Sequence, residues 1–342
     1  MGMLHLPDDR GALRRLLGRH PVASAFGALV LLVAVVVGLA WQRAASAQRA
    51  DPDFVARVER PAYVTEHPRV LIDAAHHDFH TATGNYRPFA DLLRRDGYEV
   101  AGNRAAFSDA TLSGYRVLVV ANALGAKGVL AMLADLVGIH SALGWDLQAF
   151  APAECDAVRD WVAAGGSLLL IADHAPMGKA AQALARRFGV EMSNCFTEDD
   201  THCVPDHYSW LVFARADGTL RAHPVTDGRD SAERVDTVVT FTGQSLKGPA
   251  GSVPFLSLTD NARDYPTRRS TLREGRSAAG RAQGIALQFG KGRVVVLGEA
   301  AMLTAQVFRL PGQEVRLGME YPGSGDRQLA LNIMHWLSGL TN

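Results

Sequence analysis

The chain has 342 residues, of which 48% are hydrophobic, 20% charged and 7% aromatic. This composition is typical of a globular protein and excludes wholesale disorder, collagen and coiled coil. Lysine plus arginine equals aspartate plus glutamate at 35 each, so the chain has no overall positive charge to hold a nucleic-acid backbone. We therefore expect no nucleic-acid partner.

The N-terminal segment contains a long run without charged residues. Residues 23–41 read ASAFGALVLLVAVVVGLAW, which is just long enough for a helix to cross the core of a bilayer. Arginines within residues 1–22 favour an N-terminus inside the cell. We predict a single-pass helix at 23–41 in the inner (cell) membrane, a basic cytoplasmic segment at 1–22, and a C-terminal domain in the periplasm or outside the cell. The alternative is a cleaved signal peptide, because Ala45-Ser46-Ala47 has the small-residue pattern of a cleavage site.

Beyond a linker at 42–66, the chain alternates apolar strands with amphipathic helices. The strand-like runs are RVLIDAA (69–75), YRVLVVANA (115–123), SLLLIA (167–172), and a pair at 283–289 and 293–297. Apolar residues recur at helical spacing in 86–96, 153–164, 179–188 and 326–340. Such alternation predicts a parallel sheet covered on both faces. We predict a doubly wound, mostly parallel, flavodoxin-like α/β domain over 67–342, with an irregular insertion at about 197–281. The Arg-rich end of the insertion, 263–281, is expected to be an exposed, mobile loop.

Three cysteines occur, at Cys155, Cys195 and Cys203. In an oxidising compartment, Cys195 and Cys203 are expected to form a local disulfide. The alternative is a metal site built from Cys195, His202, Cys203 and His207, although this spacing matches no common zinc pattern. Cys155 lies at the start of an amphipathic segment and is expected to be a small buried residue.

Polar and ionisable residues follow four of the predicted strands. The sequence after the first strand contains His76, His77, Asp78, His80, Thr81 and Gly84; the others are followed by Asn122, by Asp173 and His174, and by Glu299. In an open α/β sheet, ligands bind outside the carboxyl ends of the strands. The pattern therefore predicts a site at this edge, where His76, Asn122, His174 and Glu299 share one pocket mouth.

Three interpretations of this edge remain open. His76, His80, Asp173 and His174 could hold a divalent metal such as zinc that activates water. Without a metal, His174 oriented by Asp173 or Asp73 could act as general base. The third interpretation is a hydrogen-bonded network that only holds the loops together. The candidate catalytic residues are His76, His80, Asp173, His174 and Glu299, and the candidate substrate-binding residues are His77, Thr81, Gly84 and Asn122.

Several of these blocks resemble a known superfamily. RVLIDAAHHDFHTATGNYRPFADLLRRDGYEV, WVAAGGSLLLIADHAPMG, HPVTDGR and GKGRVVVLGEAAMLTAQ are similar to class I glutamine amidotransferase-like domains, with ThuA-like proteins and the GldG or intraflagellar-transport type of domain among the relatives. The resemblance covers roughly residues 68–340 and implies a flavodoxin-like sheet.

The chain departs from this superfamily at the nucleophile. A glutaminase needs a cysteine in a tight turn after a strand, but SLLLIA is followed here by Asp173-His174-Ala175-Pro176. We therefore predict a membrane-anchored, externally facing amidotransferase-like domain that lacks glutaminase activity. It would bind a small polar or sugar-like ligand and, if it is an enzyme, hydrolyse it. The alternative is a non-catalytic ligand-binding or assembly module.

Overall fold

The computed structural model describes residues 33–35, 37–38, 49–125, 147–266, 275–310 and 313–342. The chain divides into two units, Met1–Ala47 and Gln48–Asn342, and everything below concerns the second. No helix within the described ranges combines the length and the apolar character that a membrane crossing requires. The predicted anchor at 23–41 lies mostly outside the described residues, and the predicted segment at 1–22 lies wholly outside them.

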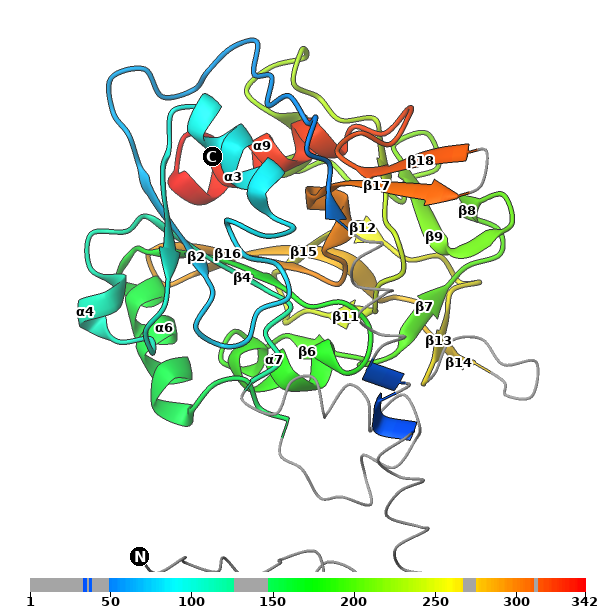
Figure 1. Ribbon diagram of the computed structural model, residues 1–342, viewed down its shortest axis with the longest axis horizontal. Helices are drawn as coiled ribbons and strands as arrows, with labels where there is room; N and C mark the ends of the chain where they lie inside the picture. Colours follow the sequence, from blue (N-terminus) through cyan, green and yellow to red (C-terminus); the bar gives the residue numbers. More distant parts are fainter. Residues whose placement is uncertain (1–32, 36, 39–48, 126–146, 267–274, 311–312) are drawn as a thin grey trace, which may run out of the picture. The chain divides into compact units, whose positions relative to one another are not determined.

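A nine-stranded sheet forms the centre of the second unit (Figure 1). Its strands are β2 (Arg69–Asp73), β3 (Glu99–Asn103), β4 (Val117–Ala121), β5 (Ser167–Ile171), β6 (Glu191–Met192), β11 (Leu246–Lys247), β12 (Val253–Ser257), β15 (Ala282–Phe289) and β16 (Gly292–Leu297). Their order is β3-β2-β4-β5-β16-β15-β11-β6, with β12 also paired to β15. The first five strands in this order are parallel, and β15 joins β16 antiparallel. The predicted α/β fold with a mostly parallel central sheet is confirmed.

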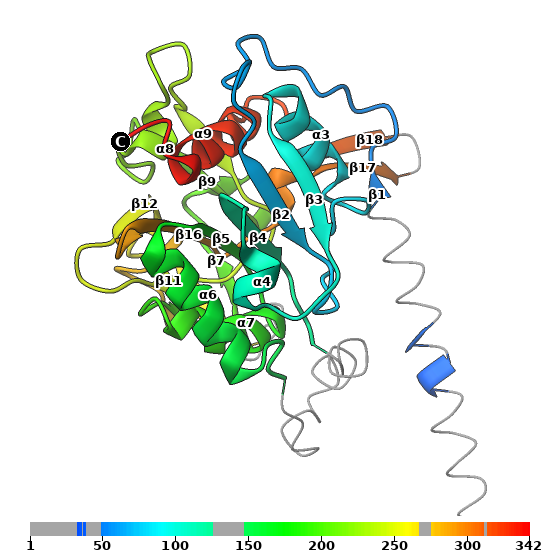
Figure 2. The same ribbon diagram turned by 90° about the vertical axis from the view of Figure 1, so that its left-hand side faces the viewer.

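Helices cover both faces of the sheet (Figure 2). α3 (Arg87–Arg95) and α9 (Asp326–Ser338) pack on one face, whereas α4 (Asp109–Leu112), α6 (Pro152–Ala164) and α7 (Met177–Arg186) pack on the other. Val119 and Val120, neighbours in β4, belong to two different core clusters, one on each face. Successive side chains of a strand point to opposite faces, so a strand covered on both sides must be apolar throughout. This explains why all five residues of β4 are buried.

The remaining strands form three small sheets. They are β1-β17-β18, from Arg49–Ala50, Ala305–Leu310 and Gln313–Gly318; β10-β9-β8, from Thr237–Val239, His207–Ala214 and Cys203–Val204; and β14-β13-β7, from Arg276–Ser277, Arg263–Tyr265 and Phe196–Glu198. A short helix, α8 (Pro224–Asp227), lies between β9 and β10. The expectation of a loop over 263–281 needs correction, because β13 and β14 pair within it; residues 267–274 lie outside the described residues.

The described part of the predicted linker belongs to the second unit. Asp51 and Phe54 are buried, and Phe54 belongs to the core cluster that contains α9. The backbone N–H of Asp51 donates to the carbonyl of Ala305 at 2.8 Å. Residues 49–54 are therefore held by the folded body.

The cysteines differ from the first expectation. All three are free thiols, so the Cys195–Cys203 disulfide is not formed. Arg276 instead donates a hydrogen bond to the Cys195 sulfur at 3.1 Å. His202 bonds Thr201 and His207 stacks on Trp210, so the alternative metal set is not assembled either. Cys155 is fully buried, as expected.

Candidate active site

The ends of β2, β4, β5 and β16 meet at one edge of the sheet. The four strands are parallel neighbours, so the residues that follow them are brought side by side. The backbone N–H of Asn122 donates to the carbonyl of Ile171 at 3.0 Å, and that of Ala172 donates to Leu297 at 3.1 Å. The residues that follow β4, β5 and β16 are therefore brought together at this edge.

The Asp173 network consists of His80, Asn122 and Asp173. Asn122 Nδ2 donates to Asp173 Oδ2 at 2.7 Å and lies 3.2 Å from His80 Nδ1. The backbone N–H of Asp173 donates to Asn122 Oδ1 at 2.8 Å. Asp173 Oδ1 accepts the backbone N–H of Ala300, directly after Glu299, at 2.5 Å. Three strand ends thus converge on one half-buried carboxyl group.

Burial sets the protonation states in this network. Burial raises the pKa of Asp173 to about 7, although hydrogen bonds from Asn122 and Ala300 pull it downward. Burial also lowers the pKa of His80 to about 3, so its imidazole is neutral at pH 7. Asn122 Nδ2 is a donor, so the neutral His80 accepts at Nδ1 and carries its proton on Nε2. Asp173 is therefore the group of this network that titrates near neutral pH.

Glu299 supports the Asp173 network through the turn that contains Ala300. Its side chain is fully buried, and its two oxygens accept the backbone N–H groups of Ala301 at 2.7 Å and Met302 at 2.8 Å. These bonds cap a short 3₁₀ helix, η2 (Ala301–Leu303). Burial and the nearby Asp173 charge raise the pKa of Glu299 well above its usual range. A carboxyl group in this position fixes the turn that contains Ala300, and the catalytic role expected for Glu299 stays a prediction.

A second cluster, the His76 triad, consists of Asp73, His76 and Glu154. His76 Nδ1 lies 2.6 Å from Asp73 Oδ2, and its Nε2 lies 2.8 Å from Glu154 Oε1. The ring also packs against Phe107 and Phe150. Burial alone would lower the pKa of His76, but its two carboxylate partners outweigh burial and raise it to about 9. His76 is therefore an imidazolium that links the end of β2 to α6.

The triad does not fit a metal bound through His76. A histidine ligand needs a nitrogen lone pair, but both His76 nitrogens face carboxylate oxygens and so carry protons. Among the described residues, the histidines, cysteines and acids that converge closely enough to hold an ion are Asp73, His76 and Asp78. Burial and the Asp73 charge raise the pKa of Asp78, so Asp78 keeps its proton to a higher pH than an ordinary carboxyl group. The expected zinc ligands His80, Asp173 and His174 are not part of this group.

The other candidates lie around the two clusters. His174 is half-buried, stacks on Phe196 with ring centroids 4.1 Å apart, and directs Nδ1 to the Ala175 carbonyl. His77 is exposed, with a left-handed backbone. Thr81 and Gly84 form a turn, in which the Gly84 N–H donates to the Thr81 carbonyl at 3.0 Å. Asn122 and Glu299 thus belong with the Asp173 network and His76 with the triad, and the single pocket mouth expected for these residues and His174 stays a prediction.

Sequence analysis did not single out Glu154 or Asn103. Glu154 lies in the first turn of α6, and Asn103 at the end of β3 donates to Asp73 Oδ1 at 2.8 Å. An acidic residue in the first turn of a helix is common because of the helix dipole. That common pattern is the only sequence signal for Glu154, and it does not point to a histidine partner.

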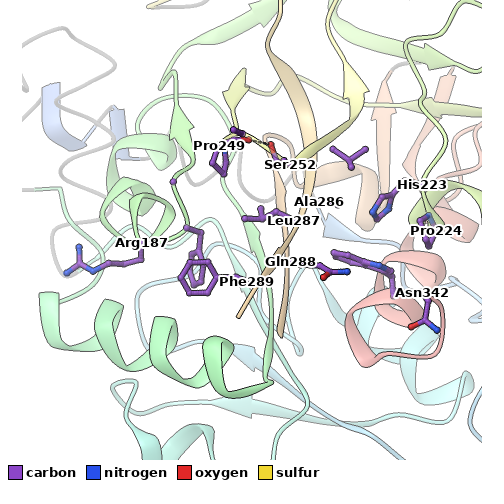
Figure 3. Close-up of a pocket in the computed structure, with 16 residues that line it drawn as sticks. Arg187, His223, Pro224, Pro249, Ser252, Ala286, Leu287, Gln288, Phe289 and Asn342 are labelled. Carbon is purple, nitrogen blue, oxygen red and sulfur yellow. Dashed lines mark hydrogen bonds between the residues drawn. The ribbon is translucent and has the colours of Figure 1, made fainter. Parts of the chain in front are cut away.

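One cavity among the described residues lies away from both clusters. It has a volume of about 690 Å³, and His223, Trp336, Gln288 and Phe289 are among its lining residues (Figure 3). Gln288 and Phe289 pair with the first residues of β16, so this cavity is at the edge opposite to the Asp173 network. None of the candidate site residues lines it.

Comparison with known proteins identifies a shared fold but does not assign the chain to a family. No family model matches the chain, and no curated protein matches it. A solved structure of the mmIFT52 N-terminal domain is similar at a TM-score of 0.52 and 13% identity, covering 80% of this chain and 98% of that one. Other similar structures include putative ThuA-like proteins. That from Bacteroides uniformis has a TM-score of 0.41 and 14% identity over 81% of this chain and 94% of its own; that from Parabacteroides merdae has 0.41 and 10% over 81% and 91%. The first likeness establishes a shared fold.

Proposed function

We propose that this chain is an amidotransferase-like domain that binds a small polar or sugar-like ligand at the Asp173 network and hydrolyses it without a metal or a nucleophilic cysteine. The observation that carries the proposal is the state of Asp173, a half-buried carboxyl group whose pKa is raised to about 7 by burial. A general acid or base works best when its pKa lies near the working pH. Perturbed groups of this kind concentrate at functional sites.

Asp173 would act on water in this mechanism. As a carboxylate it would accept a proton from a water molecule, whose oxygen then attacks the electrophilic carbon of the ligand. As an acid it would return that proton to the leaving group. Asn122 and the Ala300 N–H hold both Asp173 oxygens, and Glu299 fixes the turn that contains Ala300. His174, beside Asp173 in the chain and half-buried, is proposed to contact the ligand.

A non-catalytic binding or assembly module is the second candidate. It is favoured by the saturation of the polar groups, because both Asp173 oxygens and both His76 nitrogens already have partners inside the protein. In this second candidate, the sole role of the network is to hold the loops in place. The two candidates differ in whether bound ligand is turned over.

The experiment uses the full-length chain, Asp173→Asn, and Asp160→Asn as the matched control on an exposed part of α6. Binding is measured by saturation-transfer NMR with D-glucose, D-galactose and L-glutamine. Turnover is measured with p-nitrophenyl acetate and p-nitrophenyl β-D-glucoside. We expect turnover with an apparent pKa near 7 that falls by about a hundredfold or more in Asp173→Asn and is unchanged in Asp160→Asn. Binding without turnover would favour the module, and neither binding nor turnover would reject the proposed ligand class.

We also propose that residues 23–41 anchor the chain in the inner membrane and place the C-terminal domain outside the cytoplasm. The uncharged run and the arginines before it support this proposal. Sodium carbonate extraction of membranes tests the anchor, and alkaline phosphatase fused after Asn342 tests the orientation. Release by carbonate, or an inactive phosphatase fusion, would contradict it.

A further inference from the structure

A second, smaller cavity runs along one side of α9. We call it the α9 groove; its volume is about 320 Å³, at the low end of small-molecule sites. Three segments line it: residues 57–60, the stretch around Arg229 and Glu233 before β10, and the flank of α9 from Gly325 to His335. None of the residues of the Asp173 network or the His76 triad contributes to it. The groove is therefore a separate site in the same unit.

Two of the arginines in the groove form no close ion pair within the described residues. Within the described residues, neither Arg57 nor Arg327 has a carboxylate oxygen within 4.0 Å, the limit for an ion pair. Burial lowers the pKa of Arg327, the charge of Glu320 raises it, and the charge of Arg57 lowers it by a smaller amount. The guanidinium of Arg327 lies over the Phe54 ring, 5.0 Å from its centroid, which fixes its position. Two like charges held close together are unfavourable unless an anion joins them.

The other two arginines of the groove are already neutralised. Arg60 donates to Glu233 Oε1 at 2.9 Å, and Arg229 Nε donates to the same carboxylate at 2.8 and 2.9 Å. Asp230 adds a second partner for Arg60. Glu233 and the exposed Glu59 are the carboxylates that line the groove. The arginines of the groove without a close carboxylate partner thus lie at the Arg57 and Arg327 end.

The same end contains the N-terminus of α9. This helix has 13 residues, and its N-cap residue is Gly325, which supplies no side-chain cap. The first N–H groups of a helix have no partner within the helix and carry partial positive charge. An anion at this end would accept hydrogen bonds from these N–H groups, as anions do at other helix N-termini.

A buried, unpartnered nitrogen also belongs to the groove. His335 is 1% exposed, and its Nε2 lies 2.7 Å from Asp96 Oδ2. Its Nδ1 is buried without a hydrogen-bond partner in the described protein, and the nearest carboxylate oxygen, on Glu233, is 4.0 Å away. Buried polar atoms are almost always paired, so His335 Nδ1 has an open position for one hydrogen bond, to a water molecule or to a polar group of a bound molecule.

We propose that the α9 groove binds a small molecule through an oxyanion, a phosphate or a carboxylate, held between Arg57, Arg327 and the N-terminus of α9. Planar guanidinium groups recognise either oxyanion with paired hydrogen bonds. The body of the molecule lies along the apolar surface of Val58 and Leu331, with His335 Nδ1 bonding a polar group farther along. The inference does not depend on the proposed hydrolysis, because the two sites share no residue.

The test is titration of the full-length chain with inorganic phosphate and, separately, with acetate in chloride-matched buffer, followed by isothermal calorimetry. We expect saturable binding of one of the two anions. Arg327→Gln and Arg57→Gln should each weaken it by about tenfold or more, whereas Arg94→Gln, on the exposed surface of α3, should leave it unchanged. Tighter binding of phosphate than of acetate assigns a phosphate-bearing ligand, and the reverse assigns a carboxylate.

Two further outcomes would overturn the inference. One is the absence of saturable binding of either anion at about 10 mM, well above a millimolar dissociation constant. The other is binding that survives both groove substitutions, which would place the anion elsewhere. Melting temperatures of each variant without anion show that the fold is intact; if Arg327→Gln unfolds, Arg57→Gln, on an exposed residue, decides the matter.

Discussion

Asn122 and Asp173 bind each other through two hydrogen bonds across the ends of neighbouring parallel strands. Asn122 Nδ2 donates to Asp173 Oδ2, and the Asp173 backbone N–H donates to Asn122 Oδ1. Asn122 achieves this with a backbone φ of 56°, in the left-handed region. One side chain thus satisfies both a carboxyl group and a backbone donor, and it fixes where that carboxyl group lies.

Two substitutions at Asn122 should separate the contribution of its hydrogen bonds from the cost of its left-handed backbone conformation. Asn122→Ala loses both hydrogen bonds and places alanine in a left-handed backbone, so we expect a loss of about 2–4 kcal/mol in the free energy of unfolding. Asn122→Gly loses the same bonds but tolerates the backbone, and should be about 1 kcal/mol more stable than the alanine variant. Urea unfolding measures both. Equal stabilities would mean that the left-handed conformation is not adopted in solution.

Asp173 should make stability depend on pH. The pKa of the folded state is about 7, above an unfolded value of about 3.8, so the charged form is disfavoured in the folded protein. The protein is then most stable below about pH 4 with respect to this group and loses stability as the pH rises toward 7. The full loss is at most about 4 kcal/mol. In Asp173→Asn this pH dependence should disappear, which unfolding at about pH 5 and about pH 7 would detect. Parallel profiles for both proteins would contradict the raised pKa.

The edge of the sheet at which these residues lie could be predicted from the sequence, because parallel strands have their carboxyl ends at the same edge. The runs that became β2, β4, β5 and β16 are nearly continuous apolar segments, which only a sheet covered on both faces requires. Once those strands are parallel, the residues after them must share an edge. Asn122 and Asp173 could therefore be placed near each other before any coordinates were known.

The side chains' partners were not accessible in the same way. His76 and His80 lie four residues apart, yet His76 turns toward Glu154 on α6 and His80 turns toward Asn122 after β4. Which way each ring points depends on the layers packed above and below the loop, and residue spacing does not encode that. The β17–β18 hairpin was also missed, since short antiparallel strands leave a weak pattern.

The three cysteines should react as free thiols. Cys195 is buried, and burial raises the pKa of its thiol although the Arg276 hydrogen bond opposes this. We expect slow reaction of Cys195 with Ellman's reagent in the native protein, because the reactive thiolate is scarce. After denaturation without reductant, all three thiols should react. A single reactive thiol per chain would instead establish the Cys195–Cys203 disulfide.

His76 should contribute stability in a different pH range. Its pKa is raised from 6.5 to about 9, so the stabilisation from the charged ring is fully present below about pH 6.5 and is lost as the pH rises through about 9. The shift corresponds to roughly 3 kcal/mol. His76→Gln should abolish this loss, whereas His67→Gln, an exposed histidine on the loop before β2, should retain it.

Glu154→Gln tests the contact between His76 and Glu154 separately from the contact between His76 and Asp73. It removes one of the two carboxylates that favour the charged ring, so the His76 titration followed by NMR should move down by about one pH unit or more while Asp73 stays in place. In Glu154 the backbone N–H groups of Phe107 and Ala151 donate to different oxygens, so the glutamine keeps only one of these two bonds; urea unfolding of the variant checks that the fold persists. A His76 midpoint near 6.5 in the unsubstituted chain would mean that the ring is not held between two carboxylates. A nitrogen would then be available to bind a metal, and the zinc interpretation would return.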